Sequence, residues 1–203
     1  MPDVATGTRE RIVERTAELL RERGYAGTGL KAISIGAGAP FGSVYHFFPD
    51  GKEELAAAAL RHAADGYATR VSDVLAEAGY DPVAATRHAF AHAAQVLVDT
   101  DFADACPIAT VALEVASSNE TLRQVTAEIF EGWLAALDAW LGATGLDAET
   151  ARRLSTLFLA ALEGGFLLSR SAQDPAPMLA LGESVADAVG SALRDRPGSP
   201  SAG

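Results

Sequence analysis

The chain has 203 residues, which suits a small domain joined to a larger one, and its 49% hydrophobic residues are enough for a substantial core. It contains no apolar run of about 18 residues, so a membrane span is not expected. Residues 1–8 lack a basic cluster followed by an apolar run, which argues against a secretory signal. The single cysteine, Cys106, cannot form an internal disulfide and therefore favours a reducing cytoplasm.

The net charge of −11 argues at first against a nucleic-acid partner, but its distribution changes that interpretation. Residues 1–62 carry eight basic and eight acidic side chains, whereas residues 63–203 carry eight arginines and nineteen acids. The neutral N-terminal part can still present a basic face, while phosphates would repel the acidic remainder. An acidic surface that only aids solubility explains the same distribution equally well.

Helical periodicity extends over most of the chain and β-branched alternation is scarce, so we expect an all-α fold. The predicted helices cover residues 8–23, 30–37, 41–48, 52–78, 83–99, 107–117, 120–142, 148–171 and 176–194. The tail, residues 196–203, is rich in Pro, Gly and Ser and is expected to be disordered.

Local signals predict where several helices begin and end. Gly24 is expected to end the first helix in the left-handed conformation. Asp50 and Glu53 have the spacing of a capping box at the start of the long fourth helix. The predicted N-caps of two later long helices are Asn119 and Asp147.

Two short helices, 30–37 and 41–48, are separated by a glycine turn and braced by the longer helix 8–23. This is the arrangement of a helix-turn-helix, although spacing alone is a weak signal because compact helical proteins often contain short helices. Gly42 has no side chain, so the expected recognition helix can lie close to base edges. Ser43 can bond a base edge or a phosphate.

The resemblance to a known family rests on three segments: GYAGT at 24–28, GAPFGSVYHFFP at 38–49 and KEEL at 52–55. Together they are similar to the signature of the tetracycline-repressor (TetR) family, over about residues 8–60. A narrower likeness, to the LmrA/YxaF-type regulators, rests on Thr28-Gly29-Leu30, the extra Gly51 and Cys106-Pro107.

The resemblance implies a one-component repressor that binds a palindromic operator as a homodimer and is released by a small apolar effector. It implies an N-terminal three-helix helix-turn-helix domain and a C-terminal helical domain for ligand binding and dimerisation. We place these at residues 1–50 and 51–195, linked by the helix at about 52–78. An effector would act by shifting this helix, which joins the ligand cavity to the DNA-binding domain.

The candidate DNA-binding residues combine base-edge and phosphate contacts. By family resemblance Tyr45 and His46 reach phosphates, and the starts of the second and fourth helices favour phosphate because of their free N–H groups. The full set is Thr28, Lys31, Phe41, Gly42, Ser43, Tyr45, His46 and Lys52.

The chain departs from the family pattern at Phe41, where TetR-like proteins often carry Lys or Arg. The recognition helix therefore has no basic residue, which predicts weaker and less salt-dependent non-specific binding. Phe41 can instead contact a thymine methyl group. The same departure slightly favours an alternative function, a helical small-molecule-binding module without DNA binding.

The predicted effector site is mostly apolar, with Trp133 available to stack on a flat ligand. Its candidate residues are Phe90, Cys106, Ile108, Phe130, Trp133, Leu134, Leu137, Leu162, Glu163 and Phe166. His88, His92 and Glu114 are further sources of polar contacts. A plain hydrophobic core explains the same apolar stripes. By resemblance, the last two helices pair with their mates in a four-helix bundle.

No catalytic residue, metal site or cofactor is predicted. Cys106 would need a histidine beside it to act as a nucleophile. His88 and His92 have the i, i+4 spacing of metal ligands, but nothing in the sequence completes the site. The expected partners are operator DNA, the effector and a second copy of the chain, in the cytoplasm.

Overall fold

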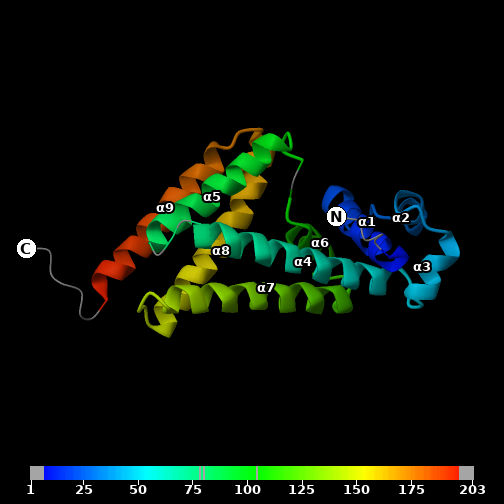
Figure 1. Ribbon diagram of the computed structural model, residues 1–203, viewed down its shortest axis with the longest axis horizontal. Helices are drawn as coiled ribbons and strands as arrows, with labels where there is room; N and C mark the ends of the chain where they lie inside the picture. The colour runs from blue at the N-terminus through cyan, green and yellow to red at the C-terminus, as the bar shows by residue number, and fades with distance from the viewer. Residues whose placement is uncertain (1–6, 78, 80, 104, 197–203) are drawn as a thin grey trace, which may run out of the picture. The chain divides into compact units, whose positions relative to one another are not determined.

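The computed structural model describes residues 7–77, 79, 81–103 and 105–196 (Figure 1). Within these residues the chain forms nine helices and no strand, which confirms the predicted all-α fold. The helices are α1 (Thr8–Arg23), α2 (Leu30–Gly36), α3 (Phe41–Phe47), α4 (Lys52–Glu77), α5 (Pro82–Asp99), α6 (Pro107–Val115), α7 (Glu120–Gly142), α8 (Ala148–Ala172) and α9 (Ala176–Asp195).

Each helix begins and ends within two residues of its predicted bounds. Two of the predicted N-caps are confirmed. The Asn119 side chain accepts a hydrogen bond from the Leu122 N–H at 2.8 Å, and Asp147 accepts one from the Thr150 N–H at 2.9 Å. The predicted tail lies, apart from Arg196, outside the described residues.

The predicted capping box of Asp50 and Glu53 is wrong. The carboxylate that accepts from the Asp50 N–H, at 3.0 Å, belongs to Glu54. Because α4 begins at Lys52, Glu54 stands one helical turn beyond the Asp50 N–H. Glu53 is thereby left to accept a hydrogen bond from the Asn119 side chain at 2.5 Å, so it ties α4 to the start of α7.

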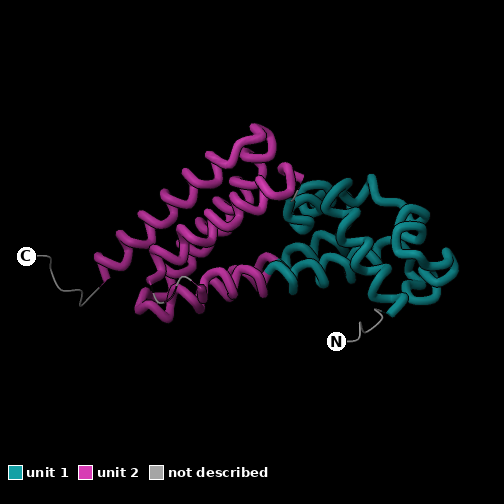
Figure 2. The backbone as a smooth tube through the Cα atoms, turned by 45° about the horizontal axis from the view of Figure 1, so that its top comes forward, with its two compact units in different colours: residues 1–67, 105–129 teal, residues 68–104, 130–203 magenta. Residues whose placement is uncertain are grey.

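Contacts within the chain divide it into two compact units (Figure 2). Unit 1 comprises the described residues up to 67 together with 105–129, so it holds α1 to α3, the first part of α4, α6 and the start of α7. Unit 2 comprises the remaining described residues and contains α5, α8 and α9. The predicted functional boundary at residue 50 stays a prediction; the unit containing the helix-turn-helix extends beyond it.

The core of unit 1 forms where the apolar stripes of its helices meet. Ile12 and Leu20 of α1, Ile33 of α2 and Val44 of α3 are each 0% exposed. Phe48, just after α3, is 1% exposed. These side chains recur at helical spacing, so burying them orients one face of each helix inward and leaves the other in solvent.

The core of unit 2 is built around α9, which packs against both α5 and α8. Phe90 of α5 and Phe158 of α8 meet edge to face, with ring centroids 5.1 Å apart. Gly182 lets α9 pack closely against Phe90, because a Cβ at Gly182 would lie 2.5 Å from the Phe90 Cβ. Among the described residues no helix has the length and apolar character needed to cross a membrane.

Candidate nucleic-acid interface

The turn between α2 and α3 is held by contacts within unit 1. Gly38 has a φ of 59°, a conformation that costs glycine little and other residues more. The buried Ser34 hydroxyl donates to the Ala39 carbonyl at 2.7 Å. From α1, the Arg11 guanidinium donates to the Ala37 carbonyl at 3.3 Å. These bonds set α3 at a defined angle to α2, as a helix-turn-helix requires.

The outward face of α3 carries most of the predicted DNA-binding residues. Phe41 is 48% exposed and Tyr45 is 49% exposed, and their rings meet edge to face with centroids 5.6 Å apart. Gly42 and His46 are exposed, and Ser43 is half-buried. This side of the helix faces solvent, while Val44 on its other side is buried in the domain core.

The remaining predicted DNA-binding residues differ in their surroundings. Lys31 is exposed on α2. Thr28 is 1% exposed, and its hydroxyl donates to the Gly24 carbonyl at 2.7 Å. The side chain of Thr28 therefore stabilises the turn before α2, and its contact with DNA stays a prediction.

Lys52, the first residue of α4, has a partner that the sequence did not reveal. Its ammonium lies 4.3 Å from the centroid of the Tyr25 ring, a cation–π contact. Burial lowers the pKa of Lys52, and the nearby carboxylate of Glu114 opposes that effect. Burial, together with the carboxylates of Glu53 and Glu114, raises the pKa of the Tyr25 hydroxyl.

Glu114 of α6 connects this cluster to the turn between α1 and α2. Its two carboxylate oxygens accept hydrogen bonds from the backbone N–H groups of Tyr25 and Ala26, each at 2.6 Å. We refer to this pair of bonds as the Glu114 clamp. Gly24, with φ 68° and ψ −175°, is outside the left-handed helical region expected for it. A Cβ at Gly24 would lie 2.6 Å from the Glu114 carboxylate, so glycine makes room for the clamp.

From the sequence alone, Glu114 is expected only as a polar contact for an effector. In the clamp, Glu114 is separated along the chain from Tyr25 by 89 positions and from Ala26 by 88. No local sequence pattern predicts a pairing over such a distance. The available signal is the charge itself, since Glu114 is the one ionisable residue of α6.

The predicted effector residues are divided between the two units. Eight belong to unit 2: Phe90, Phe130, Trp133, Leu134, Leu137, Leu162, Glu163 and Phe166. Of these, Phe90, Leu137 and Phe166 are buried in its core, and the others are partly buried. Cys106 and Ile108 are buried in unit 1. Their roles as ligand contacts stay predictions.

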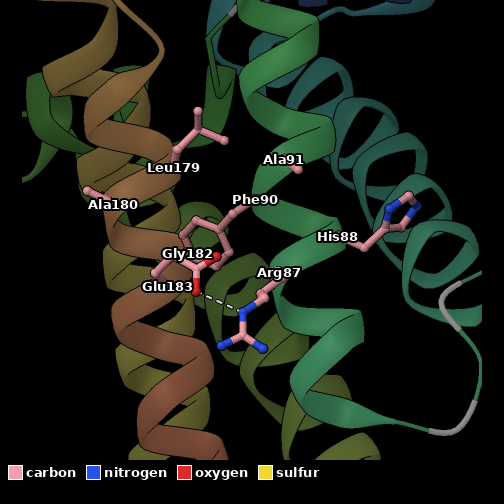
Figure 3. A pocket seen from close by; sticks show the side chains of 8 residues that line it. All are labelled: Arg87, His88, Phe90, Ala91, Leu179, Ala180, Gly182 and Glu183. Carbon is pink, nitrogen blue, oxygen red and sulfur yellow. Dashed lines mark hydrogen bonds and ion pairs between the residues drawn. The ribbon is translucent and has the colours of Figure 1, made fainter.

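Unit 2 carries a groove between α5 and α9, shown in Figure 3. Phe90 is the predicted effector residue that lines it, beside Gly182 and Leu179. Arg87 and Glu183 face each other at one end and form an ion pair at 2.8 Å. The groove is lined mainly by apolar surface, but it is open to solvent and carries this ion pair, so it is not an enclosed cavity.

Comparison with known proteins agrees with this geometry. Residues 12–59, which span α1 to the start of α4, match the bacterial regulatory proteins of the tetR family. Residues 82–184 match the C-terminal domain of LmrA/YxaF-like transcriptional regulators. The HTH-type transcriptional regulator YxaF of Bacillus subtilis is 34% identical over 88% of this chain and 93% of its own length.

This chain belongs to the TetR family. It is a transcriptional regulator with a helix-turn-helix DNA-binding domain, and the LmrA/YxaF-type subgroup is confirmed. The HTH-type regulator LmrA of Bacillus subtilis is 31% identical over 89% of this chain and 95% of its own length. A regulatory protein TetR from Rhodobacter sphaeroides has the same fold, with a TM-score of 0.79, 19% identity, and coverage of 89% of this chain and 98% of that one.

Proposed function

We propose that this TetR-family regulator is a repressor that binds a palindromic operator as a homodimer and is released by a small apolar effector. The observation that carries the DNA-binding half of the proposal is the exposed face of α3, where Phe41, Gly42, Tyr45 and His46 reach solvent. A helix-turn-helix reads the major groove with such a face, and a two-fold dimer reads two half-sites about one helical turn apart.

Dimer formation through α8 and α9 is supported by apolar side chains that unit 2 leaves in solvent. Leu157 and Leu168, three helical turns apart on α8, are 43% and 53% exposed, and Leu179 of α9 is 45% exposed. An exposed apolar surface of this kind is typical of an interface between subunits. Leu168→Glu should convert the dimer into monomers in analytical ultracentrifugation and weaken operator binding, whereas Leu113→Glu, at an 83% exposed site on α6, should do neither.

The apolar effector is supported by the aromatic pair of α7, Phe130 and Trp133, whose ring centroids are 5.8 Å apart and which are both partly buried. A ligand that stacks on Trp133 would change its fluorescence. Effector candidates should be screened by this signal and then by release of the operator. Trp133→Ala should weaken the effector response without weakening operator binding.

The test of the whole proposal is selection of bound duplexes from a random pool, at two salt concentrations. An enriched palindrome supports it, provided that Tyr45→Ala combined with His46→Ala abolishes the enrichment. Both side chains are exposed, so the double variant should remain folded. A reporter gene placed behind the enriched operator then distinguishes repression from activation.

The second candidate function is a small-molecule-binding module that does not bind DNA. The observation that favours it is the absence of Lys and Arg from α3, whose sequence is FGSVYHF. Failure to enrich any duplex at either salt concentration would leave this candidate in place of the first.

A further inference from the structure

The apolar character of the exposed α3 face points to one feature of the operator. Phe41 is the first residue of α3, at the end of the recognition helix from which helix-turn-helix proteins contact base edges. Phe41 is not part of the domain core, since the residue is 48% exposed, whereas Val44 of the same helix is 0% exposed.

The Phe41 ring packs against Tyr45, which is itself bordered by the residue before α4. Tyr45, one turn along, meets it edge to face with centroids 5.6 Å apart. Gly51, before α4, would bring a Cβ to 4.0 Å from the Tyr45 ring, so the start of α4 borders the tyrosine in turn. Gly42 adds no side chain beside Phe41. The ring is therefore exposed to solvent, with Tyr45 against one side and no side chain on the residue that follows it.

The major groove offers one apolar group to such a ring. Guanine, adenine and cytosine present hydrogen-bond donors and acceptors there, whereas thymine also presents its C5-methyl group. A phenyl ring placed over a donor or acceptor would remove water from it without replacing the hydrogen bond, which is unfavourable. Placed over a methyl group it buries apolar surface on both sides, which is favourable.

We propose that Phe41, supported by Tyr45, recognises the C5-methyl group of one thymine in each operator half-site. This inference rests on the proposed function, because it specifies how the DNA-binding face selects its sequence. Base recognition by the start of α3 then depends on apolar contact, while Tyr45 and His46, further along the helix, keep their expected phosphate contacts.

The experiment uses the full-length protein and the palindrome obtained by selection. Each thymine of a half-site is replaced in turn by deoxyuridine, which removes the C5-methyl group and keeps every hydrogen-bonding group. At one position the wild-type protein should bind about three- to fourfold more weakly, as expected for one buried methyl group. Replacement in both half-sites should weaken binding about tenfold.

The variants assign the effect to Phe41. Phe41→Ala should bind the thymine and deoxyuridine operators with equal affinity, and Phe41→Leu should retain a smaller preference for thymine. Ile35→Ala is the matched control, because Ile35 is an apolar residue of α2 that is 71% exposed, and this variant should keep the wild-type preference. Circular dichroism confirms that each variant is folded.

The outcomes separate this inference from the proposed function. A selected operator that binds equally well with deoxyuridine at every position overturns the recognition of a thymine methyl, while DNA binding stands. A preference that persists in Phe41→Ala assigns the recognition to another residue and overturns the role of Phe41. If no duplex is selected at all, the proposed function and this inference both fail.

Discussion

The Glu114 clamp should decide how firmly the turn before α2 is held. Glu114→Ala removes both acceptors, so the N–H groups of Tyr25 and Ala26 must bond water instead. A hydrogen bond to a charged group contributes about 1.5–3 kcal/mol where it is buried, and solvent around the exposed Glu114 reduces this to about 1 kcal/mol each. Opening the turn should therefore become about 2 kcal/mol easier, which corresponds to about a 30-fold change in the opening equilibrium.

Amide hydrogen exchange measures that opening directly. In Glu114→Ala the amides of Tyr25 and Ala26 should exchange about 30-fold faster. Glu114→Gln, whose amide keeps one acceptor oxygen, should give an intermediate rate. Operator affinity should fall in the same order, by no more than the factor seen in exchange, because the bound state requires the closed turn.

The matched control is Glu128→Ala. Glu128 is a second exposed carboxylate of unit 1, and its ion pair with Arg61 spans 3.6 Å between two exposed side chains. Such a pair contributes little, so this variant should leave the Tyr25 and Ala26 amides unchanged. Equal exchange rates in Glu114→Ala and Glu128→Ala would refute the reasoning, since they would mean that the clamp does not hold the turn in solution.

Two further predictions concern packing and pH. Gly182→Ala should lower the free energy of unfolding by about 1–3 kcal/mol in urea titrations, because the added Cβ would lie 2.5 Å from the Phe90 Cβ. Gly132→Ala in α7, where a Cβ meets nothing within 4 Å, should instead raise it by up to about 1 kcal/mol; equal effects of the two substitutions would contradict this packing. Hydrogen bonds from Arg123 and Gln124 lower the pKa of Glu120 from 4.5 to about 2, so the stabilisation from this carboxylate is present above pH 4.5 and is lost as the pH falls towards 2. In an NMR titration Arg123→Ala should move the Glu120 midpoint back towards 4.5, and an unchanged midpoint would show that Arg123 is not the cause.

The sequence by itself determined the helices and the helix-turn-helix, because the signals for both are local. Helical periodicity depends on residues three and four positions apart, and an N-cap such as Asn119 or Asp147 bonds an N–H three residues away. The exposure of Phe41, by contrast, needed the tertiary structure, because Phe41 and the buried Val44 are three residues apart and are therefore neighbours on the helix surface.

The predicted capping box failed because the exact start of α4 decides which carboxylate accepts the hydrogen bond from the Asp50 N–H. Asp50 and Glu53 have capping-box spacing, but with α4 starting at Lys52 it is Glu54 that reaches the Asp50 N–H. A shift of one residue rotates a side chain by about 100° around a helix, so a small error in the helix start changes which carboxylate is in reach.

Only the tertiary structure decided the contacts between distant segments. The Glu114 clamp requires α6 to lie beside the turn after α1, and the Lys52–Tyr25 contact requires α4 to lie beside the same turn. The core of unit 1 brings these three segments together. Thr28 is likewise assigned to the turn before α2 only once its burial is known. Such pairings are set by which apolar faces pack against one another, and a periodic pattern along one helix carries no information about the helix that will cover it.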